Sequence, residues 1–92
     1  MATVIIPTPL RKFTNQTSKL TVDAQNIRGI IEQITVQFPE LKKHLLDEGG
    51  TLRSFVNVFS GDDDIRDLQN EDTVVDASTI VSIVPAIAGG KN

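Results

Sequence analysis

The chain has 92 residues, enough for a single domain with one modest hydrophobic core. It has no cysteine and one histidine, His44, which excludes disulfides, a cysteine nucleophile and metal sites built from thiolates or several histidines. The formal net charge of −3 lacks the basic surplus of a nucleic-acid-binding domain, so no nucleic acid is expected as a partner. Because the sequence shows no signal peptide and no apolar run of about 20 residues, we expect a cytoplasmic protein without a membrane partner.

Two strands are predicted at the start of the chain. The β-branched run 2–6 stops at Pro7 and indicates a first strand, and a turn-rich stretch follows it. In the segment 18–23, apolar Leu20 and Val22 alternate with polar residues, which is the period of a half-buried strand. These segments together predict a β-hairpin with a loop of medium length.

The apolar period then changes to steps of three and four residues, which predicts an amphipathic helix. Asn26 is a suitable N-cap for this helix and Pro39 is expected to end it. The apolar stripe consists of Ile27, Ile30, Ile31, Ile34 and Phe38. A short second helix is expected from Pro39 onward, with Gly49 or Gly50 as its C-terminal stop. Its inward-facing residues are expected to be Leu41, Leu45 and Leu46.

Three more strands are predicted in the second half. In the strand 54–61, Val56 and Val58 share one face, and the other face carries Phe55, Asn57 and Phe59. The segment "GDDD" predicts a turn, "DIRDL" over 64–68 a short fourth strand or extended piece, and 69–78 a polar loop. In the last strand, 79–85, Val81 and Ile83 share one face, and the other face carries Ile80, Ser82 and Val84.

The resulting order, β-β-α-β-β-β, predicts an α+β fold of two layers. It matches a β-grasp (ubiquitin-like) roll, in which one mixed sheet of four or five strands packs on a main helix plus a short second helix. The most hydrophobic strands, the first and the last, are expected side by side in the middle. The domain is assigned to 1–85, and 86–92 to a flexible C-terminal tail containing Gly89-Gly90.

No catalytic residue and no metal site are predicted. His44 has charged helical neighbours and is interpreted as a solvent-facing or boundary residue. The aspartates after Gly61 lack the alternating ligand spacing of a calcium loop and indicate an acidic turn at a sheet edge. We therefore expect a protein that is not itself an enzyme and binds no cofactor.

The C-terminal tail is the segment best suited to chemistry. Six residues lead from Val84 to Gly90, so an extended tail reaches about 20 Å. Glycine lets the backbone pass close to a partner because it has no side chain. Such a tail can carry a backbone carboxylate into the active site of another protein, which requires no reactive side chain of its own.

Four segments carry a family resemblance: "IPTPLR" at 6–11, "FVNVF" at 55–59, "DDDIR" at 62–66 and "VPAIAGG" at 84–90. With their spacing, they resemble the ubiquitin-like sulfur-carrier family (MoaD/ThiS-like), and within it most closely the CysO-type carriers of cysteine biosynthesis. The resemblance covers nearly the whole chain.

This resemblance implies a mechanism in which Gly90 bears the reactive carboxylate. An E1-like adenylating and sulfurtransferase enzyme would use ATP to activate it, and the resulting thiocarboxylate would pass sulfur to an acceptor. In the cysteine route the acceptor is held by a PLP-dependent cysteine synthase (CysM-like), which carries pyridoxal phosphate. The residues implied to thread into the partner behind Gly90 are Gly89, Ala88, Ile87 and Ala86.

The resemblance also implies that an apolar sheet face docks on partners. The expected docking residues are Ile5, Pro7, Phe55, Phe59 and Val84. For Phe55, packing under the second helix is an equally good interpretation. Arg11 is interpreted as a residue that ties down the loop after the first strand, with partner contact as the alternative.

The sequence departs from the family pattern after Gly90, where Lys91 and Asn92 follow. A thiocarboxylate forms only on a free terminal glycine, so we expect processing between Gly90 and Lys91, for which a zinc JAMM-type metallopeptidase is the natural enzyme. The dipeptide could instead reflect expression design, or the protein could be a pure binding module. The chain could also be a carrier for molybdopterin, thiamine or another thio-metabolite, or a ubiquitin-like modifier or adaptor without sulfur transfer.

Overall fold

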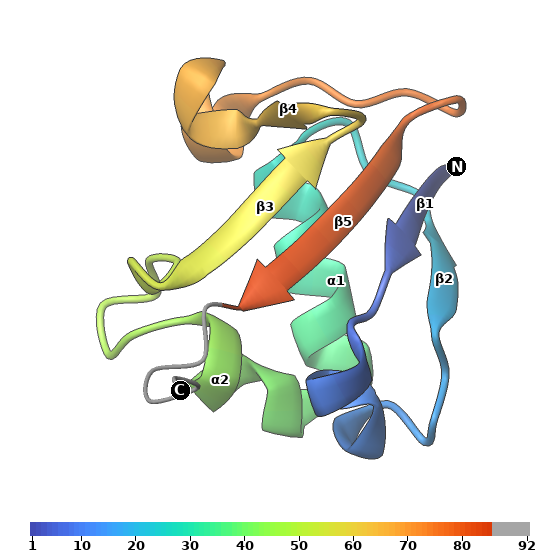
Figure 1. The fold of residues 1–92 in the computed structure, drawn as a ribbon, viewed down its shortest axis with the longest axis vertical. Coiled ribbons are helices and arrows are strands. Elements are labelled where there is room, and N and C mark those ends of the chain that lie inside the picture. The colour runs from blue at the N-terminus through green and yellow to red at the C-terminus, as the bar shows by residue number, and fades with distance from the viewer. Residues whose placement is uncertain (86–92) are drawn as a thin grey trace.

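The computed structural model describes residues 1–85, which form a five-stranded sheet with helices packed on one face (Figure 1). The strands are β1 (Ala2–Ile5), β2 (Lys19–Val22), β3 (Val56–Ser60), β4 (Asp63–Asp64) and β5 (Ile80–Pro85). Their order across the sheet is β2-β1-β5-β3-β4. Among the strands of residues 1–85, only β1 and β5 pair in parallel, and the other neighbours are antiparallel. The predicted mixed sheet, with the first and last strands adjacent in its interior, is confirmed.

The main helix, α1 (Ile27–Gln37), begins and ends where the sequence predicts. The side chain of Asn26 accepts a hydrogen bond from the Gly29 N–H at 2.8 Å, which satisfies one of the free donors of the first turn. The backbone leaves helical geometry at Phe38, directly before Pro39. None of the helices within residues 1–85 is long and apolar enough to cross a membrane.

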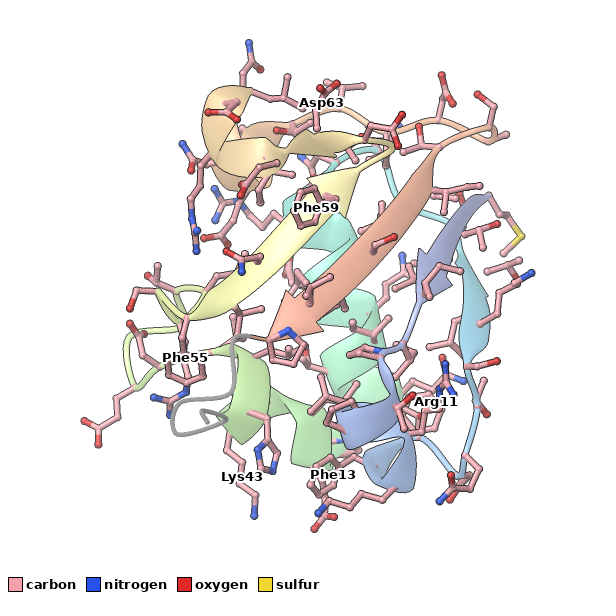
Figure 2. All side chains as sticks on the ribbon, in the orientation of Figure 1. Arg11, Phe13, Lys43, Phe55, Phe59 and Asp63 are labelled. Carbon is pink, nitrogen blue, oxygen red and sulfur yellow. The ribbon has the colours of Figure 1, made fainter. Side chains whose placement is uncertain are left out.

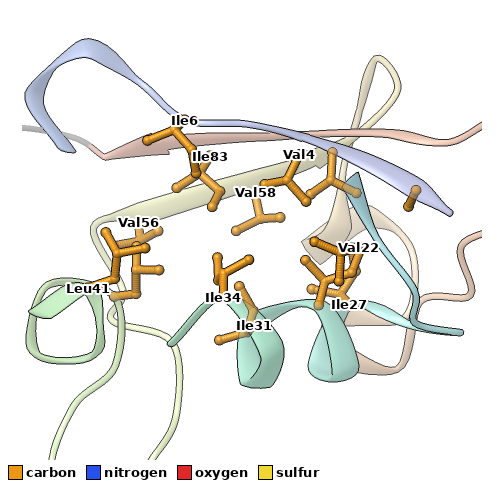
Figure 3. Packing of buried hydrophobic residues seen from close by; sticks show 14 of the residues in the cluster. Val4, Ile6, Val22, Ile27, Ile31, Ile34, Leu41, Val56, Val58 and Ile83 are labelled. Carbon is orange, nitrogen blue, oxygen red and sulfur yellow. The ribbon is translucent and has the colours of Figure 1, made fainter. Parts of the chain in front are cut away.

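The core lies between α1 and the inner face of the sheet, as Figure 3 shows. Alternate residues of the central strands point toward the helix because side chains alternate along a strand. The fully or almost fully buried residues of the two layers include Val4, Val56, Val58, Val81, Ile83, Ile27, Ile30, Ile31 and Ile34. The predicted inward faces of β3 and β5 and the predicted apolar stripe of α1 are therefore confirmed.

The second helix ends earlier than predicted. A 3₁₀ turn, η2 (Pro39–Leu41), leads directly into α2 (Lys42–Leu45). The helix stops at Leu46, whose extended backbone forms an isolated β-bridge with Leu52, so the predicted stop at Gly49 or Gly50 is wrong. The two glycines belong to the following turn, where Gly50 has a positive φ of 82°. The predicted inward residues Leu41 and Leu45 are buried, and Leu46 is partly buried.

The segment "DIRDL" is not the predicted strand. Strand β4 covers only Asp63 and Asp64, and a 3₁₀ turn, η3 (Ile65–Asp67), follows. The carboxylate of Asp64 accepts the Arg66 N–H at 2.9 Å and so caps that turn. A further 3₁₀ turn, η4 (Asn70–Asp72), lies in the predicted polar loop, and another, η1 (Thr8–Phe13), lies between β1 and β2. The predicted turn at Gly61 is confirmed by its positive φ of 64°.

Candidate docking face and tail base

The outer face of the sheet, opposite α1, carries apolar side chains from three neighbouring strands. Ser82 of β5 lies between Ile5 of β1 and Phe59 of β3, which are its partners in register. Ile5 and Phe59 are half-buried on this face, and Figure 2 shows the Phe59 ring in front of β3. Strands β1 and β3 therefore place these two predicted docking residues on either side of β5, at the same level of the sheet.

Val84 and Phe55 are the most exposed of the predicted docking residues. Their exposed fractions are 45% and 47%, and Val84 lies opposite Asn57 in the β3–β5 register. The alternative that Phe55 packs under the second helix is wrong, because the ring is open to solvent and the Arg53 guanidinium lies 5.9 Å from its centroid. Exposed apolar residues that share one face are typical of an interaction surface.

The remaining predicted docking residue, Pro7, is half-buried and follows β1 with extended backbone geometry. Sequence reasoning left Ile80 out of the docking set, although its side chain is 51% exposed on β5. The alternation along the last strand, which already placed Ile80 on the same face as Val84, was the signal that could have found it.

Arg66 holds the segment from which Phe55 projects. Because β4 pairs only with Phe59 and Ser60, no strand lies beside the first residues of β3 on this side, within residues 1–85. The Arg66 guanidinium fills this gap: it donates hydrogen bonds to the Ser54 carbonyl at 2.7 Å and the Val56 carbonyl at 3.0 Å. A third hydrogen bond, of 2.8 Å, goes to the side-chain oxygen of Asn57.

Arg11 and His44 both have structural contacts. The Arg11 Nε donates to the Ile6 carbonyl at 3.1 Å, which ties η1 to the end of β1 and confirms the predicted structural role. The half-buried His44 ring stacks on Phe13 with a centroid distance of 4.2 Å. The interpretation of His44 as a boundary residue is confirmed.

Among residues 1–85, two ionisable groups have shifted pKa values, and both lie at the end of the molecule that is distant from α2. The pKa of Arg28 is raised by its hydrogen bond and ion pair with Asp72. The pKa of Asp76 is lowered because Ser78 donates side-chain and backbone hydrogen bonds to its carboxylate. Among residues 1–85, no group of three or more His, Asp or Glu side chains is placed to hold a metal ion. Hydrogen bonds to neighbouring residues, together with an ion pair for Arg28, thus account for both pKa shifts.

Pro85, the last described residue, marks the base of the tail. It lies opposite Val56 at the start of β3, so the sheet ends beside the segment that carries Arg53 and Phe55. The predictions for the tail lie outside the described residues. They concern Ala86, Ile87, Ala88, Gly89, Gly90 and Lys91.

The ThiS family model matches residues 4–90. The chain belongs to the ThiS family. The sulfur carrier protein CysO of Mycobacterium tuberculosis is 30% identical over 90 residues, which cover 96% of this chain and 97% of that protein. The family resemblance seen in the sequence is therefore confirmed.

Two solved structures extend this similarity to the fold. A chain of the Amycolatopsis orientalis BexX/CysO complex matches with a TM-score of 0.88 and 30% identity, over 98% of this chain and 100% of that chain. The crystal structure of Mycobacterium tuberculosis CysO matches with a TM-score of 0.85 and 27% identity, over 95% of this chain and 100% of that chain. The predicted β-grasp fold is confirmed.

Proposed function

We propose that this chain is a sulfur-carrier protein of cysteine biosynthesis, and that its reactive group is the Gly90 carboxylate. The family match carries the proposal, because it extends through Gly89 and stops at Gly90. The identity to proteins named sulfur carrier protein CysO supports it further. Because Lys91 follows Gly90, the proposal includes a peptidase cut between them, for which a zinc JAMM-type enzyme is suited.

The proposed chemistry takes place on the backbone of the last glycine. In the active site of an E1-like enzyme, a Gly90 carboxylate oxygen attacks the α-phosphorus of ATP, and pyrophosphate leaves. Sulfide then attacks the carbonyl carbon of the acyl-adenylate, AMP leaves, and a thiocarboxylate remains. The acceptor enzyme is proposed to be a cysteine synthase (CysM-like) that holds pyridoxal phosphate. This chain acts as a co-substrate and contributes no catalytic side chain.

The body of the protein is proposed to hold the tail in place while the reaction occurs. The exposed residues Phe55 and Val84 lie beside the tail base and offer apolar surface to a partner. Ile5, Phe59 and Pro7 extend this surface across the sheet. A partner that covers this face gains affinity from the body, so the tail itself needs few side-chain contacts.

The decisive experiment compares three proteins: the 92-residue chain, a chain that ends at Gly90, and that shorter chain with Gly90→Ala. Each is incubated with an E1-like enzyme from the same organism, ATP and sulfide, and its intact mass is measured. We expect one oxygen to be replaced by sulfur in the chain that ends at Gly90. The 92-residue chain is expected to stay unchanged until the peptidase is added.

Two results would contradict parts of the proposal. If the chain ending at Gly90 keeps its mass with every activating enzyme of the organism, it is not a sulfur carrier. If the thiocarboxylate forms but the CysM-like synthase does not consume it to make cysteine, the carrier role stands and the cysteine route is wrong. Molybdopterin and thiamine synthesis are then the acceptor routes to assay.

A further inference from the structure

The charges of the described residues are segregated along the molecule. Five cationic side chains surround the end toward which β5 runs, and we call them the tail-side cations: Arg11, Lys12, Lys42, Lys43 and Arg53. The opposite end carries Asp62, Asp63, Asp64, Asp67, Glu71, Asp72 and Asp76. Figure 2 shows Arg11 and Lys43 at one end and Asp63 at the other. Although the net charge of the protein is −3, one end of it is therefore basic.

The tail-side cations are brought together by contacts that η1 and the segment before β3 make with α2. Phe13 of η1 stacks on His44 of α2, which brings Lys12 close to α2. The Arg53 N–H donates to the Leu45 carbonyl, and its Nε donates to the Lys43 carbonyl at 3.0 Å. The carboxylates at this end are fewer and comprise Glu40, Asp47 and Glu48. The Asp47 carboxylate already accepts the Gly49 and Thr51 N–H groups.

The two ends also differ in how their cations are neutralised. At the acidic end, Arg28 forms ion pairs with Glu71 and Asp72, and Arg66 lies 4.0 Å from the Asp64 carboxylate. Within residues 1–85, none of the tail-side cations forms an ion pair. Their charges are thus available to a partner, and Lys12, Lys42 and Lys43 are exposed.

The length of the tail brings these charges against its partner. An enzyme that acts on Gly90 must place its reactive centre within about 20 Å of Val84, since six extended residues reach no further. The surface around the tail base then contacts the mouth of the channel that admits the tail. At an ionic strength of about 0.1 M, charges act over about 10 Å, so the tail-side cations act on that mouth.

We infer that the tail-side cations dock on an acidic rim around the channel through which the activating enzyme admits the tail. This inference rests on the proposed function and adds the chemistry of the partner surface. The activating enzyme is the occupant because every acceptor route of the proposed function begins with that enzyme. Opposite charges on two approaching surfaces raise the association rate and fix the orientation in which the tail meets its channel.

The test measures association of the 92-residue chain with an E1-like enzyme from the same organism, by stopped-flow at about 0.1 M and about 1 M salt. The test variant, Lys42→Gln/Lys43→Gln, removes two charges beside the tail base. The matched control, Gln25→Glu/Gln69→Glu, lowers the net charge equally at positions away from the tail base. We expect the test variant to associate about fivefold more slowly at low salt, and the control to change by less than about twofold. At high salt the difference is expected to vanish.

Three outcomes would overturn the inference. If both double variants slow association equally, only the net charge matters and no local rim exists. If the lysine variant associates normally at both salt concentrations while the chain ending at Gly90 still gains sulfur, the docking inference fails and the proposed function survives. If the wild-type chain does not bind an activating enzyme and does not gain sulfur after truncation at Gly90, the proposed function fails. The docking inference then fails too, because it rests on that function.

Discussion

Substitution of Arg66 tests whether its hydrogen bonds stabilise the segment that carries the docking residue Phe55. Arg66→Ala removes three hydrogen bonds, two of them to the backbone carbonyls of Ser54 and Val56 at the unpaired edge of β3. Arg28 is a matched comparison, because its side chain is 52% exposed and that of Arg66 47%. Arg28 instead contacts carboxylates, which water solvates well once the guanidinium is removed.

The expected magnitude follows from the acceptors. A hydrogen bond contributes about 0.5–1.5 kcal/mol net, with the low end for acceptors that water can reach. With the Ser54 and Asn57 acceptors at the low end and the part-buried Val56 carbonyl at the high end, Arg66→Ala should cost about 2.5 kcal/mol. For a domain of this size that corresponds to a fall in Tm of roughly 10 °C. Exposed ion pairs contribute little to stability, so Arg28→Ala should cost clearly less than Arg66→Ala.

Urea denaturation of the wild type, Arg66→Ala, Arg66→Lys and Arg28→Ala measures these differences as shifts of the midpoint at constant slope. Arg66→Lys should recover only part of the loss, because an ammonium group does not reproduce the planar fork that reaches several acceptors. The reasoning is refuted if Arg28→Ala is as destabilising as Arg66→Ala, or if Arg66→Lys equals the wild type.

Three further predictions concern other parts of the molecule. Gly29→Ala, which ordinarily stabilises a helix by up to about 1 kcal/mol, should gain nothing in urea denaturation, because the new Cβ would lie 3.1 Å from that of Ala24. Asp76→Asn should lower Tm at neutral pH, since Ser78 donates to the carboxylate and lowers its pKa. That stabilisation is present above the unfolded pKa of about 3.9 and is lost as pH falls through the lower folded pKa, as thermal melts at decreasing pH can show. Val84→Gln, which removes apolar surface without adding a charge, should weaken binding to the activating enzyme about tenfold in titration calorimetry while leaving stability unchanged.

Each of these three predictions has a clear contrary result. A Gly29→Ala protein more stable than the wild type would mean that the loop before α1 shifts to accommodate the methyl group. A Tm difference for Asp76→Asn that persists unchanged at the lowest pH would exclude the carboxylate charge as its origin. Normal binding of Val84→Gln would place the docking surface elsewhere, and Val36→Gln, on an exposed residue of α1, is the control.

Apolar periodicity predicted the elements whose side chains divide cleanly between core and solvent. The alternation in β5 and the three- and four-residue steps in α1 follow from burial of one face, which is a property that the sequence records directly. The same alternation placed Phe55 and Phe59 on the outer face. The sequence did not decide whether Phe55 is buried or exposed, because that depends on where α2 ends.

The failed predictions depend on backbone bridges and side-chain caps, which the apolar periodicity of the sequence does not encode. Leu46 leaves the helix because it bridges to Leu52, and local propensity contains no information about that bridge. The turn at Ile65 forms because a preceding carboxylate caps it, and side-chain capping competes with strand pairing. The tail-side cations come from three separate segments between Arg11 and Arg53, so only the fold reveals that they share one end.

The parallel pairing of β1 with β5 makes the order of folding events predictable. Val4 pairs with Leu20, 16 positions later in the chain, and with Val81, 77 positions later. Loop-closure entropy makes the second pairing about 1.4 kcal/mol more costly than the first. We therefore expect the β1–β2 hairpin and α1 to assemble early and β5 to join in the rate-limiting step. Until β5 docks, the core residues Val4 and Val58 of its neighbouring strands are not fully covered, so a nascent chain that lacks this strand presents an apolar surface to chaperones.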